Sequence, residues 1–201
     1  MSQVASGTQF GRASLADRKN DLYETPKCAT RALIPFLDRD EAIWEPACGP
    51  GAIVRELRFA GFTVHATDLV DYGLEESEGG VDFLMERPRA WRSEPSRPSV
   101  IVTNPPFKLA DAFTRHALTL ADTVWIFQRL SWLEGAKRAD LIDRHLDLIL
   151  LGIERLPMMH REGWEGPRLG ASAMPFAWFR FEARRELGRA TRFKRISWRG
   201  A

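Results

Sequence analysis

The order of apolar segments along the 201-residue chain constrains its fold more than any other feature. Short runs with the composition of buried strands alternate with stretches of helical periodicity. Such alternation produces a mostly parallel sheet, because each helix carries the chain back to the end of the sheet at which the previous strand began. The sequence therefore predicts an α/β domain with helices on both faces of the sheet.

Seven strands and three helices are expected. The strands lie at residues 42–45, 62–67, 81–84, 100–103, 123–127, 148–153 and 173–181, and the helices at 52–60, 109–120 and 135–145. A Gly-rich loop without helical pattern joins the last two strands, so these should pair antiparallel at one edge of the sheet. The acidic stretch 75–80 and the Pro- and Arg-rich stretch 87–98 are predicted to be surface loops.

Four of the expected strands end in chemically distinctive groups. These are residues 45–51 (EPACGPG), Asp68, the pair Asp82-Phe83, and residues 104–107 (NPPF). In open sheets of this type, ligands bind beyond the carboxyl ends of the strands. The four groups are therefore expected to meet at one rim and to form the functional site.

The glycines of residues 45–51 allow a ligand to approach the backbone, and the helix that follows offers free N–H groups. The segment differs from the dinucleotide fingerprint GxGxxG, because no third glycine follows. Asp68, at the end of the next strand, is suited to accept both hydroxyls of a ribose. A turn cap is the ordinary alternative for an Asp in this position.

Residues 104–107 carry the most specific chemistry. Consecutive prolines fix the backbone and offer no N–H donors. The carbonyl of Pro105 and the side-chain oxygen of Asn104 then form a pair of acceptors for an amino group, while Phe107 supplies a flat face. This combination favours a planar substrate that bears an amino group, such as adenine.

Three segments, in this order, resemble motifs of a known family. Residues 45–51 resemble motif I of class I S-adenosylmethionine (SAM)-dependent methyltransferases, and residues 104–107 resemble motif IV of the amino-methyltransferases. The segment Tyr23-Glu24-Thr25-Pro26 resembles motif X of adenine-N6 DNA methyltransferases. Over residues 21–183 the chain resembles small phage and prophage DNA adenine methyltransferases. Residues 129–135, with Lys137 and Arg138, also resemble a segment after the fifth strand of such enzymes.

The resemblance implies a Rossmann-like class I methyltransferase fold with a seven-stranded, mostly parallel sheet, one antiparallel strand, and SAM as cofactor. It assigns cofactor binding to eleven residues: Tyr23, Thr25, Pro26, Glu45, Ala47, Cys48, Gly49, Gly51, Asp68, Asp82 and Phe83. Asp68 would bind the ribose, Asp82 the adenine amino group, and the others chiefly the methionine part. The catalytic residues would be Asn104, Pro105, Pro106 and Phe107.

The implied reaction is methyl transfer to the N6 amino group of adenine in DNA. The methyl group of SAM is already activated, so we expect no metal, and the cysteines and histidines show no ligand spacing. Two acceptors on the hydrogens of the amino group would stabilise the charge that develops on its nitrogen. A base in duplex DNA must be flipped out to reach such a site.

Positive charge is concentrated at the end of the chain. Residues 184–201 contain seven Lys or Arg residues and one Glu, although the formal net charge of the whole chain is only +2. We expect a flexible N-terminal segment (1–20), a methyltransferase domain (21–183) and a basic tail (184–201) that contacts nucleic acid. The expected nucleic-acid contacts are Arg129, Lys137, Arg138, His160, Arg161, Trp164, Arg168, Arg184, Arg185, Arg192 and Lys194.

Two cysteines, Cys28 and Cys48, are too few for a disulfide framework. The first residues have no apolar segment typical of a signal peptide, and no apolar run approaches the ~20 residues of a membrane span. We expect a cytoplasmic protein.

Alternatives to adenine in DNA remain open. No separate target-recognition domain fits into the chain. Either the recognised DNA sequence is short or loosely defined, or the substrate is not duplex DNA. The NPP(Y/F) signature also occurs in enzymes that methylate amino groups of RNA bases or protein glutamine, and cytosine-N4 transfer uses related chemistry. A further alternative is a non-catalytic module that binds nucleic acid or SAM.

Overall fold

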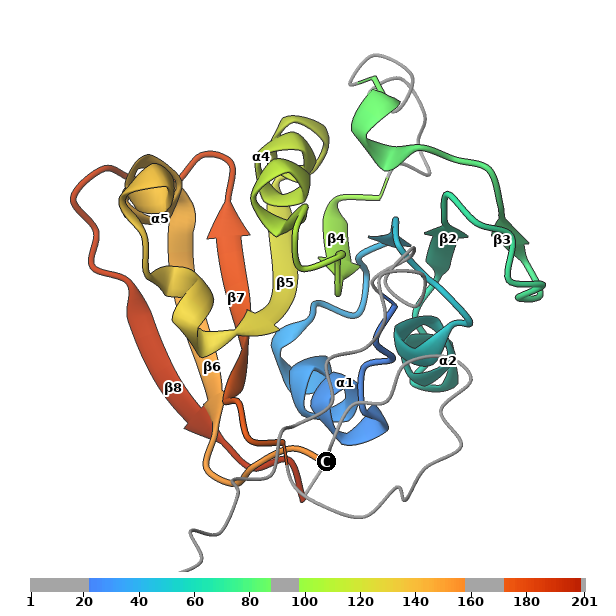
Figure 1. Ribbon diagram of the computed structural model, residues 1–201, viewed down its shortest axis with the longest axis horizontal. Coiled ribbons are helices and arrows are strands. Elements are labelled where there is room, and N and C mark those ends of the chain that lie inside the picture. The colour runs from blue at the N-terminus through green and yellow to red at the C-terminus, as the bar shows by residue number, and fades with distance from the viewer. Residues whose placement is uncertain (1–21, 88–97, 158–171, 200–201) are drawn as a thin grey trace, which may run out of the picture.

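The computed structural model describes residues 22–87, 98–157 and 172–199 (Figure 1). Its strands are β1 (Ile43–Glu45), β2 (Val64–Thr67), β3 (Ser77–Glu78), β4 (Val100–Thr103), β5 (Thr123–Arg129), β6 (Leu146–Gly152), β7 (Phe176–Glu182) and β8 (Arg192–Ile196). Its α-helices are α1 (Lys27–Leu33), α2 (Ala52–Phe59), α4 (Ala110–Leu120) and α5 (Ala139–His145). Short 3₁₀ turns are η2 (Ile34–Phe36), η3 (Phe83–Met85), η4 (Leu130–Leu133) and η5 (Ala136–Arg138).

The eight strands of the described residues form one sheet in the order β3-β2-β1-β4-β5-β7-β6-β8, with β3 and β8 at opposite edges (Figure 1). All neighbouring strands are parallel except β7, which runs antiparallel to both β5 and β6. The predicted α/β fold is therefore confirmed. The predicted antiparallel pairing of the last two expected strands is also confirmed.

Side chains of each central strand alternate between two cores. In β5, Trp125 and Phe127 pack in the core that contains residues of α1 and α2, whereas Val124 and Ile126 pack in the core that contains residues of α4 and α5. This alternation follows from the two-residue period of a strand. Helices therefore cover both faces of the sheet, and the ends of its central strands are held in fixed positions.

Helix α1 was not among the expected elements, and one buried hydrogen bond attaches it to the sheet. The indole Nε1–H of Trp178 in β7 donates to the carbonyl oxygen of Ala29 at 2.8 Å, across 149 residues of sequence. Both residues are fully buried. This contact fixes the segment that begins with Tyr23, which the sequence predicts to be part of the site.

One expected strand is wrong. Residues 81–84 contain no strand; Phe83–Met85 forms η3, and the Asp82 side chain accepts from the Leu84 N–H at 3.0 Å at its start. The strand at this edge is β3, inside the stretch 75–80 that was expected to be a loop. A polar two-residue edge strand has no hydrophobic pattern, and the three apolar residues of 81–84 do not distinguish a strand from a turn.

The expected basic tail contributes a strand to the sheet. Strand β8 pairs in parallel with β6, so the pair β6–β7 does not lie at the edge and the sheet has eight strands rather than seven. Its first four residues are exposed and three of them are basic, which hid the strand from an analysis based on apolar runs. Ile196, the last residue of β8, and Trp198 beyond it are buried in the core that contains residues of α1.

We expect Trp198→Ala to lower the free energy of unfolding by about 3–5 kcal/mol, as is typical when a buried large aromatic side chain is truncated. Trp198 is 3% exposed, and its backbone N–H donates to Glu154 Oε2 at 3.1 Å. Urea-induced unfolding measures the effect, and the exposed neighbour Arg199→Ala is the control. Equal stability of the two variants would show that the end of the chain is not part of the core.

Candidate active site

A cavity of about 400 Å³ lies beyond the carboxyl ends of β1, β2 and β4. Its size falls within the usual range for small-molecule and cofactor sites. Its lining comes from the segment before α1, the loops after the three strands, and η3. The lining residues are Leu22, Tyr23, Glu24, Thr25, Pro46, Ala47, Cys48, Pro50, Ala52, Ile53, Asp68, Leu69, Val70, Tyr72, Val81, Asp82, Phe83, Leu84, Asn104, Pro105, Pro106, Phe107, Lys108, Leu109 and Phe113.

Asp68 organises the Gly-rich loop between β1 and α2. Its Oδ2 accepts from the Gly49 N–H and its Oδ1 from the Val70 N–H, both at 2.9 Å. Gly51, with φ +93°, lies in the left-handed region and directly precedes α2, where glycine avoids the strain of a side chain. Each Asp68 oxygen has a further lone pair, so the carboxylate is suited to accept from ligand hydroxyls as well.

Asp82 and Phe83 close another side of the cavity. The Phe83 ring is 2% exposed and contacts the rings of Trp44, Phe113 and His116 at centroid distances of 5.2, 4.8 and 5.1 Å. Asp82 is exposed and caps η3. This arrangement places an acceptor beside a rigid apolar wall, which suits the edge and face of an adenine ring.

Glu45 lies beneath the loop rather than on the cavity wall. Its side chain is completely buried, and Oε1 accepts from the Ala47 N–H at 3.2 Å. Burial raises the pKa of Glu45 to about 8, although the Thr103 hydroxyl and the Ala47 N–H favour the charged form. The carboxyl group is therefore mainly protonated at neutral pH and acts as a support for the loop.

The side-chain amide of Asn104 is held by the segment before α1. Its Nδ2 donates to the Tyr23 carbonyl oxygen at 2.9 Å and to Thr25 Oγ1 at 3.0 Å. A carbonyl oxygen only accepts, so the orientation of the amide is fixed. Its Oδ1 is buried and has no hydrogen-bond partner among the described residues. Because Asn104 lines the cavity, this oxygen is the candidate acceptor for a ligand there.

The backbone and the aromatic ring that follow Asn104 are also held in place. The Pro105 carbonyl oxygen accepts from Gln128 Nε2 at 3.5 Å, a long contact that leaves its second lone pair available. The Phe107 ring stacks on Tyr23 at a centroid distance of 5.3 Å and contacts Phe176 at 6.2 Å. The structure thus brings together all four residues of the NPPF segment and the segment that resembles motif X.

Four of the eleven expected cofactor-binding residues, Pro26, Glu45, Gly49 and Gly51, do not line the cavity. Pro26 instead begins α1, and its carbonyl oxygen accepts from the Ala29 N–H at 2.9 Å. The remaining residues fit a molecule with hydroxyl, amino and apolar parts, because carboxylates and apolar side chains share the lining. The unpartnered oxygen of Asn104 lies at the same cavity.

The expected nucleic-acid contacts do not form one surface. Arg138 donates to the carbonyl oxygens of Trp132 and Glu134. The buried Arg185 donates to the carbonyl oxygens of Asp143 and Arg189. Arg192 forms an ion pair with the buried Asp147. Lys194 lies 4.7 Å from the centre of the Phe36 ring, whereas Lys137 and Arg184 are exposed and Arg129 contacts Phe107. His160, Arg161, Trp164 and Arg168 lie outside the described residues.

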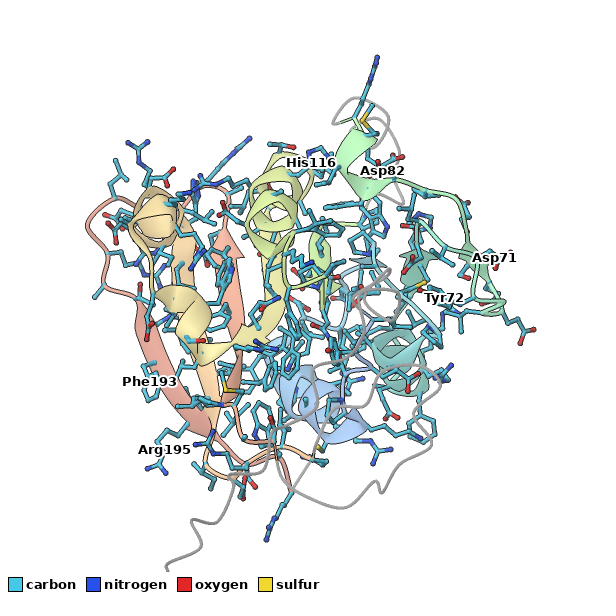
Figure 2. All side chains as sticks on the ribbon, viewed as in Figure 1. Asp71, Tyr72, Asp82, His116, Phe193 and Arg195 are labelled. Atoms are coloured by element: carbon cyan, nitrogen blue, oxygen red, sulfur yellow. The ribbon has the colours of Figure 1, made fainter. Side chains whose placement is uncertain are left out.

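Strand β8 also lies far from the cofactor side of the cavity. Figure 2 shows Phe193 and Arg195 on β8 at one side of the molecule, and Tyr72 and Asp82 at the other. Sequence reasoning gave no role to Tyr72 or Phe176, and placed Gln128 only within a stretch, 128–137, expected to contact the target; these residues line the cavity or hold the NPPF segment. Their positions after or within strands were visible, but their residue types alone give no functional signal.

No family model matches the sequence, and no curated protein is similar to it. Solved structures do share its fold. A "putative RNA methyltransferase" from Pyrococcus horikoshii superposes with a TM-score of 0.56 at 14% identity, over 85% of this chain and 91% of that one.

Two modification subunits of type I restriction enzymes have the same fold. The subunit from Vibrio vulnificus gives a TM-score of 0.54 at 14% identity, over 87% of this chain and 47% of that one. The EcoKI M protein gives 0.51 at 17% identity, over 83% of this chain and 45% of that one. The chain spans about half the length of these subunits. It therefore has the Rossmann-like fold of methyltransferases.

The described ranges hold neither a membrane-spanning helix nor a cluster of metal ligands. Within residues 22–87, 98–157 and 172–199, no helix has the length and apolar character needed to cross a membrane. Over the same ranges, no three His, Cys, Asp or Glu side chains are placed together as ligands of a metal ion.

We expect Glu45→Gln to change how stability depends on pH. Because the pKa of Glu45 is raised in the folded protein, the folded state binds an extra proton between about pH 4.5 and 8. Wild-type stability should fall across that window by at most about 1.4 kcal/mol per pH unit from this group. Chemical denaturation at pH 5 and pH 8 measures the difference. The free energy of unfolding of the variant relative to the wild type should increase as pH rises. The same difference at pH 5 and pH 8 would contradict the protonated state of Glu45.

Proposed function

We propose that this protein is a SAM-dependent methyltransferase that transfers a methyl group to the N6 amino nitrogen of adenine in DNA. The observation that carries the proposal is the fixed, unpartnered Oδ1 of Asn104. Pro105, whose carbonyl is the second expected acceptor, and Phe107 line the same cavity as Asn104. An amino group with two hydrogens matches two acceptors, and a planar ring matches the aromatic side chain.

SAM is the cofactor expected of this fold, and the cavity lining fits it. Asp68 is placed to accept from ribose hydroxyls, Asp82 from the adenine amino group, and Phe83 to pack against the adenine ring. Tyr23 and Thr25 lie at the end of the cavity that Asn104 shares. When bound, SAM supplies a methyl group on a positively charged sulfur, which is already activated for transfer.

The residues of the chain act on the acceptor. Adenine N6 is a poor nucleophile, because its lone pair is delocalised into the ring. Acceptance of its hydrogens by Asn104 and Pro105 favours a pyramidal nitrogen and stabilises the charge that develops during attack. Held by Asn104 and Pro105, the nitrogen would attack the methyl carbon that SAM supplies; the carbon–sulfur bond would break with its electron pair on sulfur, and the nitrogen would release one proton to water. The rest of the catalysis is positioning for in-line transfer.

DNA is the acceptor that we favour among the polymers. The segments at residues 23–26, 45–51 and 104–107 together resemble those of DNA adenine methyltransferases, and two of the structures with this fold are modification subunits of restriction enzymes. The target adenine would leave the duplex to enter the site. Stacking against Phe107 would replace part of the stacking energy lost, at about 1–3 kcal/mol per base.

RNA is the second candidate. The fold likeness to the Pyrococcus protein, whose printed name describes an RNA methyltransferase, supports it. The two candidates separate in one experiment, in which methyl-labelled SAM is incubated with unmethylated duplex DNA and with RNA. Mass spectrometry of the digested products identifies the nucleoside. N6-methyladenine in DNA supports the proposal, and methylated nucleosides from RNA alone would refute it.

We expect Asn104→Ala to lower kcat about 100-fold or more, because one of the two acceptors on the target nitrogen is lost. SAM binding, measured by calorimetry, should weaken much less than kcat falls, because the substitution removes the bonds that hold Tyr23 and Thr25 but no side chain that the proposal assigns to SAM. The exposed substitution Thr119→Ala on α4 is the control. Turnover of Asn104→Ala at the wild-type rate would remove residues 104–107 from the mechanism.

We expect Asp68→Asn to weaken SAM binding by about 10-fold, the loss typical of one hydrogen bond to a charged group. The same loss should be seen with S-adenosylhomocysteine, which has the same ribose. Asp71→Asn is the matched control, because Asp71 accepts from the Gly73 N–H at 2.8 Å in the same loop but does not line the cavity. Equal affinities of the two variants would contradict the ribose-binding role of Asp68.

A further inference from the structure

Arg129 is the charged residue that lies against the expected platform for the target base. It is the last residue of β5, whose carboxyl end is next to that of β4, and its backbone pairs with Phe176 of β7. Its guanidinium carbon lies 4.5 Å from the centre of the Phe107 ring. Three elements of the sheet thus hold Arg129 at the acceptor side of the site.

The guanidinium of Arg129 has no polar partner among the described residues. Its Nε is buried without a hydrogen bond, although the residue as a whole is partly exposed. Arg180 and Arg185 also have a buried Nε without a partner, but their terminal nitrogens pair with Asp147 and Glu182 or with carbonyl oxygens. Arg138 bonds two carbonyl oxygens, Arg115 pairs with Asp111 and Asp140, and Arg192 pairs with Asp147. A partly buried cation without an acceptor is costly, so this position has a reason other than stability.

The ligand of Arg129 is separate from the cofactor. Arg129 does not belong to the cavity lining, whereas its aromatic partner Phe107 does. An anion bound by the guanidinium would therefore lie outside the cavity, next to Phe107. Lys108 and Glu24, which do line the cavity, are both exposed and carry opposite charges. With Arg129 added, the acceptor side has a net positive charge.

We propose that Arg129 binds the phosphate of the nucleotide whose base enters the site, and so restricts the acceptor to a nucleic acid. This inference rests on the proposed function and deepens it. The planar guanidinium matches two phosphate oxygens with parallel hydrogen bonds. Without substrate the same group rests on Phe107 through a cation–π contact. A glutamine side chain has no phosphate and would leave the guanidinium without a partner, so this position disfavours a protein acceptor.

The test pairs a protein variant with a substrate variant. The substrate is a short oligonucleotide that contains an adenine methylated by the wild type, either natural or with a neutral methylphosphonate at the phosphate 5′ or 3′ to that adenine. The proteins are wild type, Arg129→Gln, Arg129→Lys, and Arg144→Gln as the matched loss of one charge. Arg144 is exposed in the last turn of α5, at the amino end of β6 and away from the cavity.

We expect Arg129→Gln to raise KM for the natural oligonucleotide about 10-fold or more, with SAM affinity unchanged and with intermediate values for Arg129→Lys. One methylphosphonate should raise KM of the wild type by a similar factor. It should not raise KM of Arg129→Gln further, because that variant has already lost the same contact. If the effects of Arg129→Gln and of the methylphosphonate on KM multiplied, the assignment to phosphate would be overturned. An equal loss of SAM affinity would also overturn it. Arg144→Gln should behave as the wild type in every assay.

A binding assay separates this inference from the proposed function. Oligonucleotide binding in the presence of S-adenosylhomocysteine needs no turnover, and loss of one phosphate contact should reduce the slope of log K against log salt by about one. If the wild type methylates no nucleic acid, the proposed function fails, while a reduced slope for Arg129→Gln still supports the phosphate contact. An unchanged slope would overturn that contact whether or not the enzyme is active.

Discussion

The arrangement of the site depends on the two hydrogen bonds made by the amide of Asn104. They join the end of β4 to Tyr23 and Thr25, which lie 81 and 79 residues earlier in the chain. The bonds satisfy both donors of the amide and leave its oxygen at the cavity without a partner among the described residues. One interaction therefore closes the cavity on the N-terminal side and also orients the acceptor on which the proposed chemistry depends.

That interaction relies in turn on how the N-terminal segment is anchored. Helix α1 follows directly after Pro26, and the bond from Trp178 to Ala29 attaches it to β7 in the middle of the sheet. Phe107 adds a second link, because it stacks on Tyr23 and contacts Phe176, also in β7. The antiparallel strand thus supports both the residues before α1 and the NPPF segment. The site is built on the sheet even though its residues lie in loops.

The sequence was sufficient to predict the central strands and the residues at their carboxyl ends. Buried strands such as β4 are uninterrupted apolar runs, and Pro and Gly mark where they end. The edge strands were missed for the opposite reason: β3 is a polar pair, and β8 has the pattern RFKRI with four exposed residues. Side-chain pairing was equally hidden, since nothing in the sequence near Arg192 or Arg185 reveals their partners Asp147 and Asp143. The protonated state of Glu45 required its burial to be known.

The position of β7 between β5 and β6 also orders the assembly of the sheet. Strand β6 hydrogen-bonds only to β7 and β8, and both come later in the chain. While the chain emerges from the ribosome, strands β1 to β5 find their neighbours as they appear, but β6 has none until residues 176–182 follow. During synthesis the apolar run of β6 therefore has no strand partner until β7 has been made. The aromatic strand that completes the acceptor side is thus also the one that joins β6 and β8 to the rest of the sheet.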